Sequence, residues 1–292
     1  MAVDERDPHS GHKTTGHEWN GIKELNTPVP KPVWFFLIVT GLFSIGYWVL
    51  MPAWPTGVTY TKGLLMTSDR QRVQAQREQG ALARADWLEQ VEATPYERLL
   101  TDPAMIARVR KDGGQLFGDN CAACHGADGR GVKGFPSLAD RDWLWGGEPE
   151  TVAETIRVGV NSAHPDTRAS EMIAFGSGGI LDPTQVANVA DYVMSLSVPV
   201  FAKGKPDSVR AGRAVFEANC VPCHGAEGRG DQSLGVPNLT DLAWINGSDW
   251  ESVYTVVNHG RKGEMPSWEG RLGPAERKLL AAYVLDLVSR PR

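Results

Sequence analysis

The feature that most constrains this chain is a short peptide that occurs twice, as CAACH at residues 121–125 and as CVPCH at residues 220–224. Each is a C-x-x-C-H sequence, which is the attachment signature of a c-type haem. The two thiols lie one helical turn apart and can both form thioethers to one porphyrin, and the histidine that follows can reach the iron. The alternatives to haem are a reducible dithiol and a Cys/His zinc site. The motifs predict two covalent haem c groups, held by Cys121, Cys124, Cys220 and Cys223, with His125 and His224 as axial ligands.

A membrane-spanning helix is expected near the N-terminus. Residues 32–61 contain no Asp, Glu, Lys or Arg, and residues 33–51 read VWFFLIVTGLFSIGYWVLM. The nineteen residues of this run would extend about 29 Å as a helix, close to the roughly 30 Å of bilayer hydrocarbon. Trp34, Trp48 and Trp54 lie near its ends, as aromatic residues do at membrane interfaces. A signal peptide would start closer to the N-terminus and end at a small-residue cleavage site, so we expect an uncleaved anchor.

Charge limits the partners of this chain but does not set its orientation. The net charge is −5 at pH 7, which disfavours a nucleic acid partner, because phosphate backbones reward basic surfaces. Basic residues occur on both sides of the apolar run, so the positive-inside rule gives no answer. Bacterial c-type haem is attached on the outer side of the cytoplasmic membrane. We therefore expect the cell inner membrane as location, with the tail in the cytoplasm and the haem domains in the periplasm.

The segments on either side of the apolar run are polar. The tail, residues 1–31, contains three histidines, which we interpret as part of a solvated tail rather than a metal site. Residues 69–93 are rich in Ala, Gln, Arg and Glu and predict a helix. Asp102 followed by Pro103 predicts an N-cap and the first position of another helix.

An internal duplication accounts for the rest of the chain. Aligning the two C-x-x-C-H motifs also aligns Gly113 with Gly212 and Phe117 with Phe216. The final segments of the two copies share the i, i+3, i+4, i+7 apolar pattern of an amphipathic helix. The first copy carries about eight extra residues, 160–167. Two tandem domains of about ninety residues are therefore expected.

This pattern resembles the class I cytochrome c domain, present twice, over roughly residues 104–198 and 207–290. The resemblance depends on the paired glycines and phenylalanines before the haem motifs and on Tyr192 and Tyr283 in the last helices. In that family the first and last helices cross near such residues, where glycine allows close approach and aromatic rings fill the crossing. The implied fold is mainly α, with one N-terminal transmembrane helix followed by two tandem class I cytochrome c domains.

Each haem iron requires a sixth ligand, and a methionine thioether is a normal one for electron-transfer haem c. Met172, in a loop before the last helix of the first domain, is the preferred candidate there, with His164 and Met194 as alternatives. Met265 is preferred in the second domain, with His259 as the alternative. Whether a methionine ligates the iron of its own domain or that of the other domain remains open.

Two further pairs of residues are expected beside the haems. The ligand histidine is usually oriented by a hydrogen bond from its other nitrogen to a carbonyl. In class I cytochromes the acceptor is a proline carbonyl, and the resemblance points to Pro136 and Pro237. Trp143 and Trp244 would either reach the haem propionates through their indole N–H groups or pack the haem pocket. No G-x-S-x-G, P-loop or H-E-x-x-H sequence indicates hydrolytic or group-transfer chemistry.

The order of tail, single membrane helix, linker and two haem domains resembles the dihaem subunit, CcoP or FixP, of cbb3-type cytochrome c oxidases. Residues 17–30, which read HEWNGIKELNTPVP, are similar to the W-D-G-I-x-E-x-N-x-P-x-P stretch before the helix in that family. Asn20 stands where Asp is common. Residues 164–168, which read HPDTR, also resemble a family segment, so the resemblance covers nearly the whole chain.

The resemblance implies a membrane-anchored electron carrier without substrate chemistry of its own, within a proton-translocating cytochrome c oxidase. It would accept electrons from soluble or membrane-bound periplasmic c-type cytochromes in aerobic or microaerobic respiration. It would pass them toward the monohaem c subunit and the catalytic haem–copper subunit. These subunits and membrane lipid are the implied partners. The alternatives are a dihaem electron-transfer subunit of a periplasmic dehydrogenase, a dihaem peroxidase and a haem-based gas sensor. A peroxidase needs an open or displaceable ligand position on one haem, and a gas sensor would normally carry a signalling domain.

The expected organisation has six parts. They are a cytoplasmic tail (1–31), a transmembrane helix (32–54), a partly helical periplasmic linker (55–102), a first cytochrome c domain (103–198), a short linker (199–206) and a second cytochrome c domain (207–292).

Overall fold

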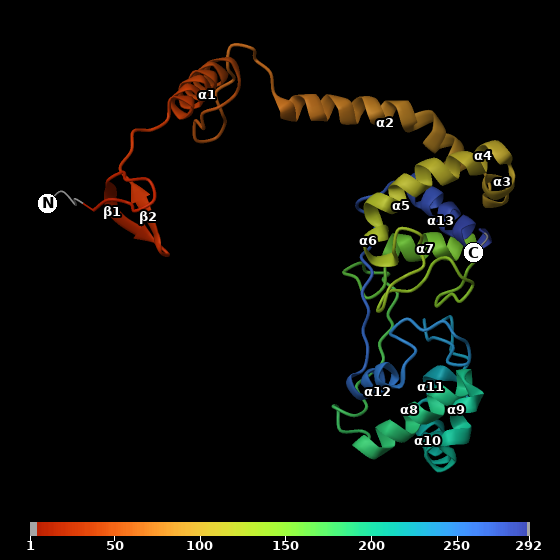
Figure 1. Cartoon of the computed structure of the whole chain (residues 1–292). Helices are drawn as coiled ribbons and strands as arrows, with labels where there is room; N and C mark the ends of the chain where they lie inside the picture. Colours follow the sequence, from red (N-terminus) through yellow and green to blue (C-terminus); the bar gives the residue numbers. More distant parts are fainter. Residues whose placement is uncertain (1–4, 291–292) are drawn as a thin grey trace. The chain divides into compact units, whose positions relative to one another are not determined.

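The computed structural model describes residues 5–290, so residues 1–4 of the expected tail and 291–292 of the expected second haem domain lie outside it. The chain divides into two compact units, Met1–Ala83 and Arg84–Arg292 (Figure 1). The first elements are β1 (Thr14–Trp19), β2 (Ile22–Leu25), α1 (Lys31–Leu50), α2 (Asp69–Ala93), α3 (Tyr96–Thr101), α4 (Pro103–Arg108), the π-helix η1 (Val109–Gly113), α5 (Gly114–Asn120) and α6 (Ala122–His125). The others are α7 (Pro149–Val158), α8 (Pro183–Ser197), α9 (Pro199–Gly204), α10 (Pro206–Asn219), α11 (Val221–His224), α12 (Trp250–His259) and α13 (Pro274–Ser289).

The N-terminal unit contains a β-hairpin where the polar composition of residues 1–31 predicts only a solvated tail. Strands β1 and β2 pair antiparallel, and Trp19 lies opposite Ile22. The turn between them is Asn20-Gly21, and both residues have positive φ, 51° and 86°. Asn-Gly is the preferred pair for a two-residue turn of this type. This local signal explains why a polar tail still forms a hairpin.

Helix α1 is the one candidate membrane span among the described residues. It begins after Pro30 with a proline in its first turn, and none of its side chains is buried within the chain. A helix that is apolar on all sides and covered by nothing suits lipid contact. The predicted apolar run thus forms a helix, Lys31–Leu50, which is long and apolar enough to span a membrane.

The segment before the first haem motif follows the sequence signals closely. Helix α2 has the predicted bounds, Asp69–Ala93, and Trp87 and Val91 in its last turns are buried in the core of the second unit. The Asp102 carboxylate accepts hydrogen bonds from the amides of Ala104 and Met105, which confirms the predicted N-cap of α4. Helices α4, η1 and α5 follow one another without a break.

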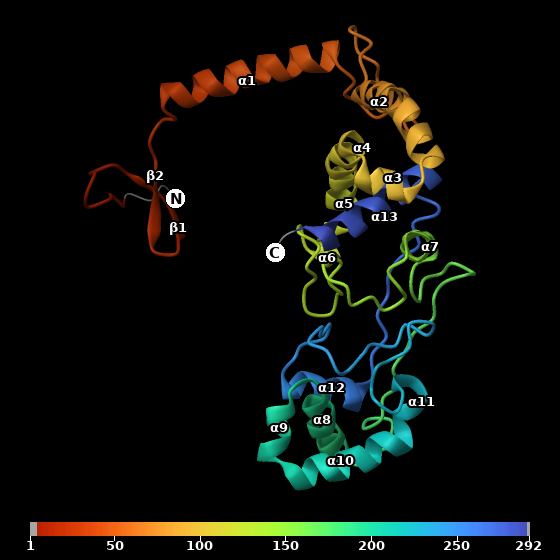
Figure 2. The ribbon, with the colours of Figure 1, turned by 90° about the vertical axis from the view of Figure 1, so that its right-hand side faces the viewer.

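The second unit contains two helical bundles, and each is assembled from both copies of the repeat. In the first bundle, helix α13 packs against η1, α5 and α7; in the second, α8 packs against α10 and α12. Both views of the ribbon place α13 beside α5 and α8 beside α10 (Figures 1 and 2). The last helix of each sequence repeat therefore covers the first helix of the other repeat.

Aromatic contacts mark both helix crossings. The ring centroids of Phe117 and Tyr283 lie 5.4 Å apart in the first bundle, and those of Phe216 and Tyr192 lie 5.2 Å apart in the second. A Cβ atom on Gly113 would fall 2.8 Å from Cβ of Tyr283, so the absence of a side chain there permits the close approach. The short segment expected as a linker, residues 199–206, forms helix α9 and the start of α10.

Two connecting segments cross between the bundles in opposite directions. Val160 and Met265 exchange both backbone hydrogen bonds at 2.9 Å. Met172 and Arg261 exchange theirs at 2.8 Å. These antiparallel bridges hold the two crossing segments side by side. Consequently each methionine emerges next to the bundle that carries the C-x-x-C-H motif of the other repeat.

Candidate haem sites

Each C-x-x-C-H motif forms a short helix directly after the first helix of its repeat. Helix α6 begins after Cys121 and ends at Gly126, whose φ is 80°. Helix α11 begins after Cys220 and ends at Gly225, whose φ is 76°. In both copies the second cysteine is exposed and the first is partly buried. Burial raises the pKa of both first thiols to about 11, so they are protonated at neutral pH.

Both motif histidines are oriented by proline carbonyls. Nδ1 of His125 lies 2.9 Å from the carbonyl oxygen of Pro136, and Nδ1 of His224 lies 3.2 Å from that of Pro237. Because a carbonyl only accepts, Nδ1 carries the proton and Nε2 keeps its lone pair. Burial lowers the pKa of both imidazoles despite these hydrogen bonds. The neutral ring with a free Nε2 is the form that binds a metal.

Two cavities lie near the motifs, one among the loops that follow both motifs and one beside the second motif. The first, about 700 Å³, is lined by Pro136, Trp143 and Tyr283 among others, and it extends to Trp244. The second, about 110 Å³, is lined by His224, Met172 and Trp244, with valines and Phe216 forming its apolar wall. Trp244 lines both cavities, so the two candidate sites are adjacent.

The two candidate methionine ligands lie in different bundles. Met172 lines the same cavity as His224. Met265 packs against the core of the first bundle, which contains Phe117 and, partly buried, Cys121 and Trp143. Met265 therefore lies in the same bundle as the first motif, and Met172 lies beside the second motif.

The alternative ligands considered for the irons are engaged elsewhere. Both ring nitrogens of His164 have partners, since Nε2 lies 2.7 Å from a Glu269 oxygen and Nδ1 accepts from the amide of Asp166 at 3.0 Å. Met194 is buried in the core of the second bundle. Nε2 of His259 lies 3.0 Å from the side-chain amide of Asn258.

The donor set in each bundle fits a c-type haem. In each bundle two thiols stand one helical turn apart and an imidazole presents a free Nε2. A thioether comes from a separate segment, Met172 in the apolar cavity beside His224 and Met265 packed on the core of the first bundle. A soft thioether together with an imidazole is an electron-transfer haem ligand pair. A tetrahedral zinc site would instead favour thiolates and imidazoles converging on one point.

Several contacts between the loops around the two sites were not predicted. The amide of Gly134 donates to the carbonyl of Ile245 at 2.7 Å. Nζ of Lys133 donates to Oγ of Ser252 at 2.8 Å. The side-chain amide of Gln232 donates to the carbonyl of Trp143 at 2.9 Å. Ser252 lies in α12 and the other residues lie in loops, and no sequence pattern marks these pairings, so only the spatial neighbours reveal them.

Comparison with known proteins gives consistent results along the chain. Residues 11–58 match the family model of the N-terminal domain of cytochrome oxidase-cbb3, FixP. Residues 111–197 match the cytochrome c model, and residues 207–284 match that of cytochrome c oxidase, cbb3-type, subunit III. A cbb3-type cytochrome c oxidase subunit FixP from Bradyrhizobium sp. strain ORS 278 is 44% identical, with 97% of each chain covered. The chain belongs to the FixP/CcoP family of cbb3-type cytochrome c oxidase subunits.

More distant FixP/CcoP relatives extend over the same length. The CcoP subunit of Azospirillum brasilense is 40% identical, with 98% of this chain and 99% of the relative covered. That of Cereibacter sphaeroides is 38% identical, with 94% of each covered. The predicted family and the predicted fold class, one N-terminal membrane helix followed by two cytochrome c domains in sequence, are confirmed. The two cytochrome c domains imply haem c binding, and α1 supports a membrane anchor.

Proposed function

We propose that this chain is the membrane-anchored dihaem electron-transfer subunit of a cbb3-type oxidase. It accepts electrons from periplasmic c-type cytochromes and passes them toward the monohaem c subunit and the haem–copper subunit that reduces oxygen. Full-length relatives carry the name of this subunit, which supports the assignment. When bound, haem c supplies reversible one-electron chemistry at its iron.

The observation that carries the proposal is the matched environment of the two motif histidines. Each has Nδ1 against a proline carbonyl, which leaves Nε2 for iron. Cys121 and Cys124 hold one haem and Cys220 and Cys223 the other. With a histidine and a methionine both bound, the iron would have no position for a small molecule, and the site would carry electrons rather than bind substrate.

His125 and Met265 would hold one haem iron, and His224 and Met172 would hold the other. The packing of Met265 on the first bundle and the position of Met172 in the cavity beside His224 support this pairing. Each iron is then held by residues from both repeats. The axial ligands therefore couple the two halves of the chain.

Trp143 and Trp244 complete the proposed pockets. Trp143 lines the first cavity and Trp244 lines both, so their rings would pack beside the proposed haems. The hydrogen bond from Gly134 to Ile245 fixes the loops around the two cavities against each other. A fixed short separation between the two haems is what transfer from one to the other requires.

The proposed orientation places the haem-binding unit in the periplasm and the hairpin on the cytoplasmic side. Attachment of c-type haem outside the cytoplasmic membrane supports this arrangement. The partners are then the other oxidase subunits in the membrane and soluble or membrane-bound c-type cytochromes at the periplasmic surface. Protease added to intact spheroplasts should digest the haem-binding unit and spare an epitope placed at the N-terminus.

The function is tested on the complex purified from native membranes through a tag on this chain. We expect two covalent haems c per chain, b-type haem and copper in the same complex, and oxygen uptake with reduced cytochrome c. A double C220A/C223A variant should lose one covalent haem and electron delivery from the donor. Co-purification with a dehydrogenase in place of a haem–copper subunit would contradict the proposal.

A further inference from the structure

The extra residues of the first repeat, 160–167, lie against the segment that carries Met265. We propose that a polar cluster of Arg157, His164 and Glu269 holds that segment in place, so that the Met265 thioether stays directed at the first haem site. These three are positioning residues for the ligand. The inference rests on the proposed haem function, and it gives the extra residues a role.

Backbone contacts bring the Met265 segment to the end of α7. Beyond the paired bonds between Val160 and Met265, Oγ of Ser267 donates to the carbonyl of Arg157 at 2.7 Å. The amide of Trp268 donates to the carbonyl of Ile156 at 3.2 Å. The last carbonyls of a helix lack partners within the helix, and here the ligand-bearing segment supplies them.

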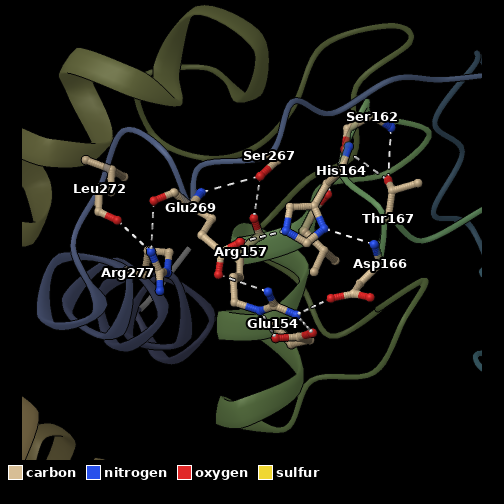
Figure 3. Close-up of polar contacts among 11 residues, drawn as sticks. Glu154, Arg157, Ser162, His164, Asp166, Thr167, Ser267, Glu269, Leu272 and Arg277 are labelled. Atoms are coloured by element: carbon tan, nitrogen blue, oxygen red, sulfur yellow. Dashed lines mark hydrogen bonds and ion pairs between the residues drawn. The ribbon is translucent and has the colours of Figure 1, made fainter.

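Arg157 is the centre of the cluster (Figure 3). Its guanidinium binds both carboxylate oxygens of Glu154 at 2.8 Å, one turn earlier on α7, which fixes its direction. It also donates to Glu269 at 3.0 Å and to Asp166 at 3.2 Å. A planar guanidinium that serves three carboxylates at once defines their positions more narrowly than separate pairs would. Arg157 thus ties α7 to both the extra residues and the Met265 segment.

His164 makes a second hydrogen bond to the carboxylate of Glu269, beside that from Arg157. Its side chain is 11% exposed, whereas that of Glu269 is 44% exposed. Because the amide of Asp166 donates to Nδ1, the ring proton is on Nε2, which donates to Glu269 at 2.7 Å. Hydrogen bonds from His164 and Arg157 lower the pKa of Glu269. The carboxylate is thus held from two sides, four residues after the ligand.

The segment that carries Met172 has an exposed ion pair in place of such a polar cluster. The neighbouring Glu171 pairs with Lys262 at 3.1 Å, and both side chains are more than half exposed. Exposed pairs of this kind contribute little because solvent screens them. The cluster is therefore specific to Met265, and disturbing it should affect one haem rather than both.

The test uses the purified full complex with an E269A variant and an E217A control. Glu217 pairs with Arg213 at 2.8 Å on the exposed face of α10, so E217A removes a similarly paired carboxylate outside the segment that carries Met265. Added imidazole competes with a methionine for ferric iron, and its binding is followed in the c-type haem absorption. For E269A we expect the apparent imidazole affinity of one haem to rise at least about fivefold, as expected for loss of charged hydrogen bonds.

Two reference variants, M265A and M172A, identify the affected haem by its midpoint potential. E269A should shift the potential of the haem that M265A affects and leave the haem that M172A affects unchanged. H164L should act like E269A, whereas H164Q, which keeps an N–H donor near Nε2, should restore most of the parent affinity. Hydrogen exchange at the amides of Val160 and Met265 should accelerate in E269A and not in E217A.

Two results would overturn the inference while leaving the haem function intact. One is an E269A complex that matches E217A in potential and imidazole affinity. The other is an equal change at both haems, which would indicate general destabilisation. Loss of a covalent haem from the parent, or an M265A variant with unchanged spectra, would instead remove the haem assignment on which the inference depends.

Discussion

Two glycines, Gly159 and Gly260, allow the segments that carry Met265 and Met172 to pass close to the ends of helices. Gly159 and Gly260 end α7 and α12 with φ of 71° and 70°. A Cβ atom on Gly159 would overlap the carbonyl oxygen of Met265, and one on Gly260 would overlap that of Met172. Each of these two glycines therefore ends its own helix and also leaves space for the segment that crosses beside it.

Alanine at either glycine should therefore weaken the structure. We expect G159A and G260A each to destabilise the protein by about 1–3 kcal/mol, because both positive φ and the overlap must be relieved. The control is G263A, which has open space around its Cβ and no positive φ. Thermal unfolding of the three variants checks this. Equal stability of G260A and G263A would contradict it.

Asp286 makes a residue-scale prediction about acid stability. This α13 carboxylate is 3% exposed and pairs with Arg110 and Arg290, both at 2.7 Å. Burial alone would raise its pKa, but the hydrogen bonds from the two arginines outweigh burial and lower it. A carboxyl with a lowered pKa in the folded state stabilises above its unfolded pKa of about 4 and loses this contribution below it.

D286N should therefore be less stable than the parent by about 1–3 kcal/mol near neutral pH, the range for hydrogen bonds to charged groups. The difference should be constant above about pH 5 and shrink as the pH falls below about 4. Unfolding followed between pH 3 and pH 7 measures it. A difference that persists unchanged at the acid end would count against the ion pair as its source.

At the scale of helices, the exchange of α8 and α13 is the main feature that the sequence could not provide. Capping and composition signals predicted α1, α2 and the start of α4 because they act within one helix. Helices α8 and α13 carry equivalent apolar patterns, with Tyr192 and Tyr283 in matching places. The repeated pattern predicts that α8 and α13 each cross the first helix of a repeat. It does not indicate whether that helix is α5 or α10.

A double-mutant cycle tests the exchange. Phe117 contacts Tyr283, so F117L and Y283L should show a coupling energy of about 0.5–1.5 kcal/mol, typical of an aromatic pair. The matched cycle of F117L with Y192L should show no coupling, since Tyr192 contacts Phe216 in the other bundle. Coupling of Phe117 to Tyr192 in place of Tyr283 would mean that each repeat folds on itself.

Within the candidate sites, the residues that could be predicted from the sequence are those that lie close together along the chain. The C-x-x-C-H motifs and the two prolines lie close together along the chain, and His125 and Pro136 meet as expected for neighbouring turns. The partners of Met172 and Met265 depend on long-range packing. For the same reason the contact of Glu269 with Arg157 and His164 had no sequence signal, since over one hundred residues separate them.

At the scale of the haem-binding unit, exchange makes the two bundles mutually dependent. A chain truncated after residue 206 would keep the first motif but lack α13, which covers Phe117 and Leu99 in the first core. It would also lack Met265. We expect this fragment to form no compact monohaem domain, and limited proteolysis compared with the full chain measures this. A protease-resistant fragment with a His/Met haem would show that the first repeat folds alone.

The most direct test of the account is an electron-microscopy structure of the intact oxidase with its haems bound. We expect the sulfur of Met265 to be bonded to the iron held by His125, and that of Met172 to the iron held by His224. The opposite pairing, with Met172 on the iron of His125, would contradict the interleaved arrangement.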